Sequence, residues 1–285
     1  MASCAAKAGN KKGEVGKANA RTAEENLKNV KHKLVVMSGK GGVGKSTVAV
    51  NLAMALTMRG KAVGLLDADI HGPSVPKMLG IQETPITANA DGQMMPVTVP
   101  PNLKVISMAF LLQSKDSPVI WRGPVKMGAL RQFLEEVAWG DLDYLIVDLP
   151  PGTGDEPLSI AQLIPSPDGS IIVTTPQDVA LLSVRKSISF SKVVGLKVIG
   201  IIENMGEMRC PHCGKTIKIF GDSGAQKAAT DFGLDFLGSI SLDQIISSSG
   251  DKGVPFIVEN SKKEISDEFD KIVDKIIGIV EDGKK

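Results

Sequence analysis

A glycine-rich loop at residues 38–47 contains the first side chains that could do chemistry. Its residues Gly39, Gly44, Lys45 and Ser46 satisfy the pattern GxxxxGK[ST], in which backbone N–H groups approach phosphate oxygens and a helix N-terminus favours negative charge. In this pattern the lysine reaches the β- and γ-phosphates and the serine hydroxyl binds Mg²⁺. The loop therefore predicts a site for the phosphates of a nucleotide. The residues expected to contact the nucleotide are Gly39, Lys40, Gly41, Gly42, Val43, Gly44, Lys45, Ser46 and Thr47, the last at the α-phosphate.

The same glycines also spell GxGxxG, the dinucleotide fingerprint, and Asp67 lies near the distance of a ribose-binding acid. Three features favour a triphosphate. Lys45 and Ser46 follow the glycines directly, an apolar run ends in two acids, Asp67 and Asp69, and the later run DYLIVD ends in Asp148. An acid in that last position is typical of the Walker B residue of a metal shell. Asp67 is expected near Mg²⁺, and Asp155 is expected to cap a helix that begins at Pro157.

Lys40 places a second ammonium group in the same loop, where it would repel Lys45 unless both find phosphate. Two interpretations remain open from the spacing alone. Lys40 is either a solvated surface lysine or a residue that reaches nucleotide bound to a neighbouring subunit, where it would stabilise charge at the γ-phosphate.

Cys210 and Cys213 form a CxxC pair in the segment CPHCG. A structural zinc site or a 4Fe–4S cluster needs four ligands, and the third cysteine, Cys4, lies far away in the sequence. A symmetric dimer would supply two pairs on its twofold axis. Three interpretations remain open: a bridging 4Fe–4S cluster, a bridging Zn²⁺ and a thioredoxin-like redox pair. The histidines His32, His71 and His212 are not expected to be ligands.

Short apolar runs alternate with helical patterns along the chain and would position these groups. We expect the apolar runs to form strands at 33–37, 62–67, 103–109, 143–148, 170–175 and 196–204. We expect helices at 45–59, 124–138, 157–163 and 179–193. The runs are almost continuously apolar, as in strands covered on both faces. The pattern predicts an α/β fold with a doubly wound, mostly parallel sheet, in which ligands bind at the carboxyl ends of the strands.

Length and composition limit the possible partners, location and domain organisation of the protein. The 285 residues carry a net charge of +1 and three cysteines, which favour neither a nucleic-acid partner nor a disulfide scaffold. No run approaches the length of a membrane span and no secretory signal is visible, so a cytoplasmic protein without a membrane partner is expected. Residues 1–30 are expected as a flexible tail, with a short helix near residues 23–31, and residues 31–285 as a single domain with a CxxC insertion around 205–220.

From about residue 30 to the C-terminus, the chain resembles the Mrp/ApbC family of iron–sulfur cluster carrier ATPases, in the deviant Walker A class of MinD, ParA and nitrogenase reductase. The motifs that carry the resemblance are KGGVGKST, DADIHGPSVPKMLG, WRGPVKMGALRQFL, VDLPPGTGDE, ENM, CPHCG and IFGDSG. The resemblance implies a homodimer that sandwiches ATP, slow ATP hydrolysis, and a labile 4Fe–4S cluster that is delivered to apoprotein acceptors.

The resemblance also implies roles for single residues. Lys40 would cross the dimer interface, Asp69 in switch I would orient the attacking water, Asp148 would open switch II, and Asn204 would read adenine. Cys210 and Cys213 would hold the cluster. The sequence departs from some members in lacking an N-terminal four-cysteine motif, and from many in reading SISLDQ at 239–244 where they read IPLDP. No chemistry is assigned to Arg122 or Lys126.

Three functions were compared on this basis. A cluster carrier accounts for both the ATP motifs and the CxxC pair. A MinD/ParA-type positioning ATPase would bind a membrane through a basic amphipathic tail, but the C-terminal segment EISDEFDKIVDKIIGIVEDGKK has a largely acidic polar face and is expected to dock on the sheet. A nitrogenase-type electron donor places its cluster cysteines singly, unlike the CxxC. A dimer-bridging zinc site of structural role remains a further alternative.

Overall fold

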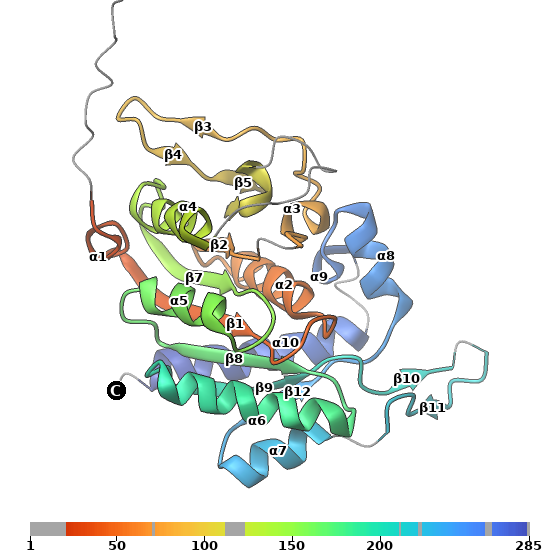
Figure 1. Ribbon diagram of the computed structural model, residues 1–285. Helices are drawn as coiled ribbons and strands as arrows, with labels where there is room; N and C mark the ends of the chain where they lie inside the picture. The colour runs from red at the N-terminus through yellow and green to blue at the C-terminus, as the bar shows by residue number, and fades with distance from the viewer. Residues whose placement is uncertain are drawn as a thin grey trace, which may run out of the picture.

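The computed structural model describes residues 21–69, 72–111, 123–210, 212–221, 224–259 and 264–283. The expectations for Cys4, His71 and Arg122 lie outside these ranges. Within them, eight strands form one sheet in the order β12-β9-β8-β1-β7-β2-β6-β5, as Figure 1 shows. The strands are β1 (Val30–Met37), β2 (Val63–Asp67), β5 (Val97–Val99), β6 (Leu103–Ser107), β7 (Leu142–Asp148), β8 (Gly169–Thr174), β9 (Val198–Glu203) and β12 (Phe236–Ser239).

All neighbouring strands in the main sheet are parallel except β5, which pairs antiparallel with β6 at one edge. The central strands β1, β2 and β7 are buried along nearly their whole length, because helices cover both faces. The predicted mostly parallel, doubly wound α/β sheet is confirmed. The strands β5 and β12 were not predicted, since each is short and lies at an edge of the sheet.

Two layers of helices sandwich the sheet. One apolar core joins α2, α3, α9 and α10 to one face, and a second core joins α1, α4, α5, α6 and α7 to the other. The helices are α1 (Ala23–Asn26), α2 (Lys45–Met58), α3 (Val75–Met78), α4 (Gly123–Glu135), α5 (Asp155–Leu163), α6 (Asp178–Val193), α7 (Gly224–Phe232), α8 (Gln244–Lys252), α9 (Phe256–Glu259) and α10 (Glu264–Ile277). Among the described residues, no helix combines the length and the apolar character needed to cross a bilayer.

The helix ends agree with the sequence in one place and differ in another. Helix α2 ends at Met58, and Gly60 follows in the left-handed conformation (φ 80°) that closes many helices. Asp155 was predicted to cap α5, but this residue is the first of the helix and Gly154 occupies the cap position without a side-chain hydrogen bond. The Asp155 carboxylate thus lies in the first turn, where its negative charge interacts favourably with the positive end of the helix dipole.

The segment before residue 31 contains regular structure. The predicted short helix near residues 23–31 is present as α1, where the Thr22 hydroxyl and the Glu25 carboxylate make a reciprocal capping box. Leu27 is buried against the core that contains Leu130 and Phe133 of α4. Residues 23–30, which the sequence places in a flexible tail, therefore contain a helix and contact the domain. At the other end, Phe269, Ile272 and Val273 of α10 are buried, so this helix docks on the sheet as expected.

A small hairpin carries the cysteine pair. Its strands β10 (Met208–Arg209) and β11 (Thr216–Ile217) pair antiparallel and project from the body of the molecule after β9 (Figure 1). A second small pair, β3 (Thr87–Ala88) and β4 (Met94–Met95), lies elsewhere in the chain. Strands β1, β2 and β7 of the main sheet end beside the start of α2. The candidate site therefore lies at their carboxyl ends.

Candidate functional site

The glycine-rich loop connects β1 to α2 and shapes a cavity of about 190 Å³. Gly42 and Gly44 adopt φ values of 78° and 81°, which L side chains rarely adopt. A Cβ atom on Gly39 would overlap the carbonyl group of Ser183 on α6. These glycines are thus required by the backbone path and by close packing. The cavity is lined by Ser38, Gly41, Gly42, Gly44, Lys45, Ser46, Thr47, Asp69, Ser74, Met78 and Pro151.

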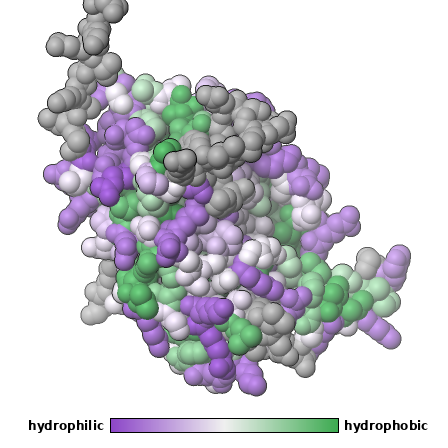
Figure 2. All heavy atoms as spheres, viewed as in Figure 1, coloured by the Kyte–Doolittle hydropathy of each residue, from purple (hydrophilic) through white to green (hydrophobic). Residues whose placement is uncertain are grey.

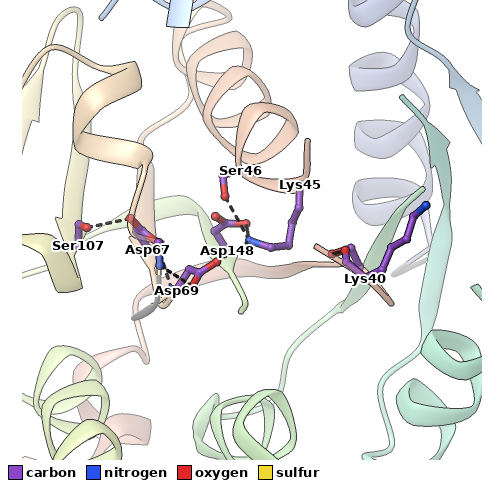
Figure 3. Close-up of polar contacts among 9 residues, drawn as sticks. Lys40, Lys45, Ser46, Asp67, Asp69, Ser107 and Asp148 are labelled. Atoms are coloured by element: carbon purple, nitrogen blue, oxygen red, sulfur yellow. Dashed lines mark hydrogen bonds and ion pairs between the residues drawn. The ribbon is translucent and has the colours of Figure 1, made fainter. Parts of the chain in front are cut away.

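Lys45 lies at the centre of the charged groups in this cavity. Its ammonium Nζ lies 2.7 Å from Oδ1 of Asp148, 3.2 Å from the Ser46 hydroxyl and 4.0 Å from Oδ2 of Asp69 (Figure 3). The side chain of Lys45 is only 6% exposed and that of Asp148 is fully buried. The structure therefore brings together the predicted residues Lys45, Ser46, Asp69 and Asp148.

Asp67 lies beside this group on β2, in register with Asp148 on β7. The Ser107 hydroxyl donates to its Oδ2 at 2.8 Å, and the backbone N–H of Asp69 donates to its Oδ1 at 3.2 Å (Figure 3). Burial, together with the nearby Asp148 carboxylate, raises the pKa of Asp67 to about 8. Asp67 therefore holds its proton more strongly than an exposed aspartate does.

The carboxylates fit a divalent cation. Burial raises the pKa of Asp148, although Lys45 and the Ser46 hydroxyl oppose the change. The Oδ2 atom of Asp148 is buried without a hydrogen-bond partner. Carboxylate and hydroxyl oxygens are the ligands that Mg²⁺ prefers, and an added positive charge would compensate two buried carboxylates held close together. Ser46, Asp67 and Asp148 could therefore hold Mg²⁺, directly or through water.

Lys40 points away from the phosphate cradle of its own chain, as Figure 3 shows. Its Nζ donates to the side-chain carbonyl of Gln177, just before α6, at 3.1 Å. A lysine whose head lies on this side of the loop does not contact phosphate in the same cavity. This geometry agrees with a role outside its own site, and the role in a neighbouring subunit stays a prediction.

Asn204 follows β9 and borders a second cavity of about 400 Å³ that adjoins the phosphate cradle. Gly44 and Thr47 line both cavities, so a nucleotide could extend from one into the other. The Asn204 amide nitrogen donates to the Val43 carbonyl at 2.9 Å, and a Cβ atom on Gly44 would overlap this amide. Asn204 therefore anchors the glycine-rich loop. The predicted contact with adenine is compatible with this position and is not tested by it.

The CxxC pair forms a tight knuckle on the β10–β11 hairpin. The Cys210 N–H donates to the Lys215 carbonyl, and the Gly214 N–H donates to the Cys210 carbonyl, each at 2.9 Å. Gly214 has a φ of 68°, which closes the turn. The backbone N–H groups of His212 and Cys213, together with the Cys213 thiol, hold the pKa of Cys210 below its usual range. The turn therefore favours a thiolate, the form that binds soft metals.

The hairpin supplies half of a tetrahedral ligand set. Across the described ranges, no group of three or more His, Cys, Asp or Glu side chains is placed to hold a metal ion. Cys213 is exposed and Cys210 is partly exposed, so both sulfurs are open to a second molecule. The residues present fit an iron–sulfur cluster or Zn²⁺ only when another chain contributes the remaining thiolates.

Sequence reasoning missed several partners of these residues. Ser107 on β6 and Gln177 before α6 are single polar residues in otherwise unremarkable segments, and only strand register and loop packing bring them to Asp67 and Lys40. Lys126, to which no chemistry was assigned, is buried and pairs with Glu156 at 3.6 Å, a structural role. No pattern in the sequence predicts any of these contacts.

Comparisons with known proteins identify the family of this chain. A model of the ParA family, described as NUBPL iron-transfer P-loop NTPase, matches residues 29–277. Proteins named iron–sulfur cluster carrier protein are 53% identical in Methanocaldococcus jannaschii, over 92% of this chain and 89% of that protein, and 51% identical in Saccharolobus solfataricus, over 90% and 86%.

Two solved structures show the same fold. A nucleotide-binding protein from Archaeoglobus fulgidus, in complex with ADP and with Co, superposes with a TM-score of 0.75 at 38% identity, over 87% of this chain and 95% of that one. The cell division ATPase MinD of Pyrococcus furiosus gives a TM-score of 0.66 at 21% identity, over 88% and 100%. The chain belongs to the ParA family of NUBPL iron-transfer P-loop NTPases.

Proposed function

We infer that this chain is an ATP-hydrolysing iron–sulfur cluster carrier. In this proposal two copies hold a labile 4Fe–4S cluster between their Cys210 and Cys213 thiolates and pass it to apoprotein acceptors. The observation that carries the proposal is the cysteine knuckle, which stabilises a thiolate but supplies only half of a ligand set. Relatives about half identical over most of the chain are named cluster carriers, which supports the same cargo.

The hairpin surface supports a contact with another protein. Ile217 and Ile219 are 40% and 48% exposed, and Figure 2 shows apolar surface on the projecting hairpin. Apolar side chains beside half a metal site suit an interface with a second copy of the chain. A cluster bound there would be reached from outside the body of the molecule, as transfer requires.

Transfer to an acceptor is proposed as ligand exchange. Thiolates of the acceptor would replace those of Cys210 and Cys213 on iron, one iron–sulfur bond forming as each breaks, with no change of oxidation state. The displaced thiolates then either take up protons or bind a new cluster. The reduced thiols that this exchange needs are those of a cytoplasmic protein.

The nucleotide site divides its work among the residues already described. Lys45 would pass from Asp148 to the β- and γ-phosphates, Thr47 would contact the α-phosphate, and Asn204 would contact adenine. Asp69, buried beside Lys45, would orient the attacking water. Bound Mg²⁺ would neutralise phosphate charge, held through Ser46 with Asp67 and Asp148 around it. We assign Lys40 to the γ-phosphate of the neighbouring subunit.

Anaerobic reconstitution tests the cargo directly. The wild-type protein is expected to bind iron and inorganic sulfide at about four of each per dimer, to show thiolate-to-iron absorbance, and to donate the cluster to an apo-ferredoxin. The double variant Cys210→Ser with Cys213→Ser is expected to bind and transfer none, whereas Cys4→Ser is the matched control and keeps both properties. A dimer that binds one zinc and no sulfide, or transfer that survives in the double variant, would refute the carrier function.

A further inference from the structure

We propose that residues 241–243 form a shared wall that couples the nucleotide cavity to Cys210, and that Glu268 is the positioning residue that holds this wall. The inference rests on the proposed function, because it concerns how the same cysteine site is regulated. It assigns a role to the segment SISLDQ, which carries none of the known motifs.

Two cavities meet at this wall. The nucleotide-side cavity of about 400 Å³ reaches from Gly44 and Asn204 to Ser241, Leu242 and Asp243. A separate cavity of about 650 Å³ lies beside Cys210, and the same Ser241, Leu242 and Asp243 line it as well. A ligand that displaces these three residues in one cavity therefore changes the shape of the other.

The chain also connects the two sites over a short distance. Met205 lines the nucleotide cavity, and only residues 206–209 lie between it and Cys210. Met205 has a φ of 58°, a conformation that costs energy for a residue with a side chain. A Cβ atom on Gly206 would overlap the Ser239 hydroxyl, so this turn is packed tightly against the end of β12, two residues before the wall.

Backbone hydrogen bonds tie the wall to this connection. The Gly206 N–H donates to the Ile240 carbonyl at 2.9 Å, and the Leu242 N–H donates to the Glu207 carbonyl at 3.0 Å. These bonds extend the pairing of β9 with β12 toward the hairpin. The wall and the segment leading to Cys210 should consequently move as a unit.

Glu268 fixes the position of this unit. Its carboxylate accepts the Ser241 N–H at 3.0 Å and the Ser241 hydroxyl at 2.9 Å. Glu268 belongs to α10, whose next residue, Phe269, is fully buried, so the anchor is rigid. Glu264, one turn earlier, pairs with Arg209, the residue immediately before Cys210. Helix α10 thus holds both the wall and the base of the knuckle.

Coupling predicts reciprocal effects on affinity. A nucleotide whose base and ribose press on the wall changes the affinity of the cysteines for metal, and metal changes the affinity for nucleotide by the same factor. ADP is the suitable probe because it lacks the γ-phosphate and so isolates the wall from the switch residues. Co²⁺ is the suitable metal because its thiolate absorbance reports cysteine ligation.

The experiment measures ADP affinity with and without Co²⁺, and Co²⁺ affinity with and without ADP, in the full-length protein. We expect the wild type to show equal factors of at least about fivefold in both directions. Glu268→Gln and Ser241→Ala each remove part of the anchor and are expected to reduce the factor below about twofold, while both ligands still bind. Ser248→Ala is the matched control, because Ser248 lines only the cysteine-side cavity and bonds within its own helix.

Three outcomes would overturn the inference: a wild type that binds both ligands without coupling, variants that keep the full factor, or a control that loses it. Failure of the proposed function looks different. In that case the anaerobically reconstituted wild type binds no inorganic sulfide, whatever coupling ADP and Co²⁺ show.

Discussion

Lys45 and Asp148 form a buried ion pair of 2.7 Å where α2 begins and β7 ends. The pair occupies the edge of the phosphate cradle, so each residue neutralises the other at the place where a nucleotide and its metal would bring their own charges. We expect nucleotide binding to exchange these partners, so that Lys45 would contact phosphate and Asp148 would contact the cation. The raised pKa of Asp67 beside them favours its neutral form, which lessens the repulsion between the two buried carboxyl groups.

Replacing Lys45 by Met tests this exchange. The variant lacks the ammonium group that reaches phosphate, and its ADP and ATP affinity is expected to fall at least about 100-fold, or ~2.7 kcal/mol. It also leaves the Asp148 carboxylate buried without its partner, so the free energy of unfolding should fall by about 3 kcal/mol or more unless the carboxylate takes up a proton. Calorimetric titration and urea unfolding measure the two effects.

Lys31→Met is the matched control for this prediction. Lys31 also pairs with an aspartate, Asp143, at 2.7 Å, but its side chain is 70% exposed. Loss of such a surface pair is expected to change stability by less than about 1 kcal/mol and to leave nucleotide affinity unchanged. If both variants lost nucleotide affinity equally, the loss could not be assigned to a contact between Lys45 and phosphate.

Lys40 is expected to act on hydrolysis and not on binding, because its head bonds to Gln177 outside the cradle. Lys40→Ala should keep nucleotide affinity within about threefold and lose about 10² to 10³ in kcat, as for removal of a group that stabilises transition-state charge. Steady-state ATP hydrolysis and equilibrium binding separate the two parameters.

Mixing variants tests whether Lys40 acts across subunits. A dimer of Lys40→Ala with Asp148→Asn contains one intact site, which uses Lys40 from the Asp148→Asn chain. Random pairing of equal amounts is expected to restore about a quarter of wild-type activity. Lys40→Ala mixed with itself restores none, and absence of any recovery in the heterologous mixture would place Lys40 in its own site.

The pKa of Asp67 predicts a pH dependence of stability for the nucleotide-free protein. Its folded pKa of about 8 lies above the ordinary aspartate pKa of 3.8, so the folded state binds an extra proton between these values. The free energy of unfolding should therefore fall as pH rises through this window. Asp67→Asn, which is uncharged at every pH, is expected to flatten the slope, as measured by urea unfolding from about pH 5 to 8.

Ser107→Ala provides the contrasting variant. The Ser107 hydroxyl lowers the pKa of Asp67, so its removal should extend the loss of stability toward higher pH. A wild-type slope that persists unchanged in Asp67→Asn would assign the dependence to another group.

Much of the fold and of the site could be predicted from the sequence, because short stretches of the chain determine the strands and the phosphate loop. The apolar runs before Asp67 and Asp148 predicted two buried parallel strands, and the parallel register then brought both acids to one edge. The glycine spacing before Lys45 predicted the cradle, since the backbone itself needs those residues.

The remaining features depend on tertiary contacts that no local pattern encodes. Ser107 meets Asp67 only through pairing of β6 with β2, and Glu268 of α10 meets Ser241 across 27 positions of the sequence. The packing of α1 on the domain follows from a capping box and the burial of Leu27 against α4, which composition alone does not reveal.

The knuckle of Cys210 predicts which part of His212 matters for metal binding. The backbone N–H of His212 heads the interactions that lower the pKa of the Cys210 thiol, while the exposed imidazole completes no metal-binding group among the described residues. His212→Ala keeps the N–H and should bind Co²⁺ as the wild type does, whereas His212→Pro removes it. The proline variant should bind Co²⁺ at least about fivefold more weakly, and its Cys210 should be alkylated by iodoacetamide only at higher pH, because less thiolate is present. Loss of Co²⁺ binding in His212→Ala would instead identify the imidazole as a ligand. Equal alkylation profiles in the two variants would show that the His212 N–H does not lower the pKa of Cys210.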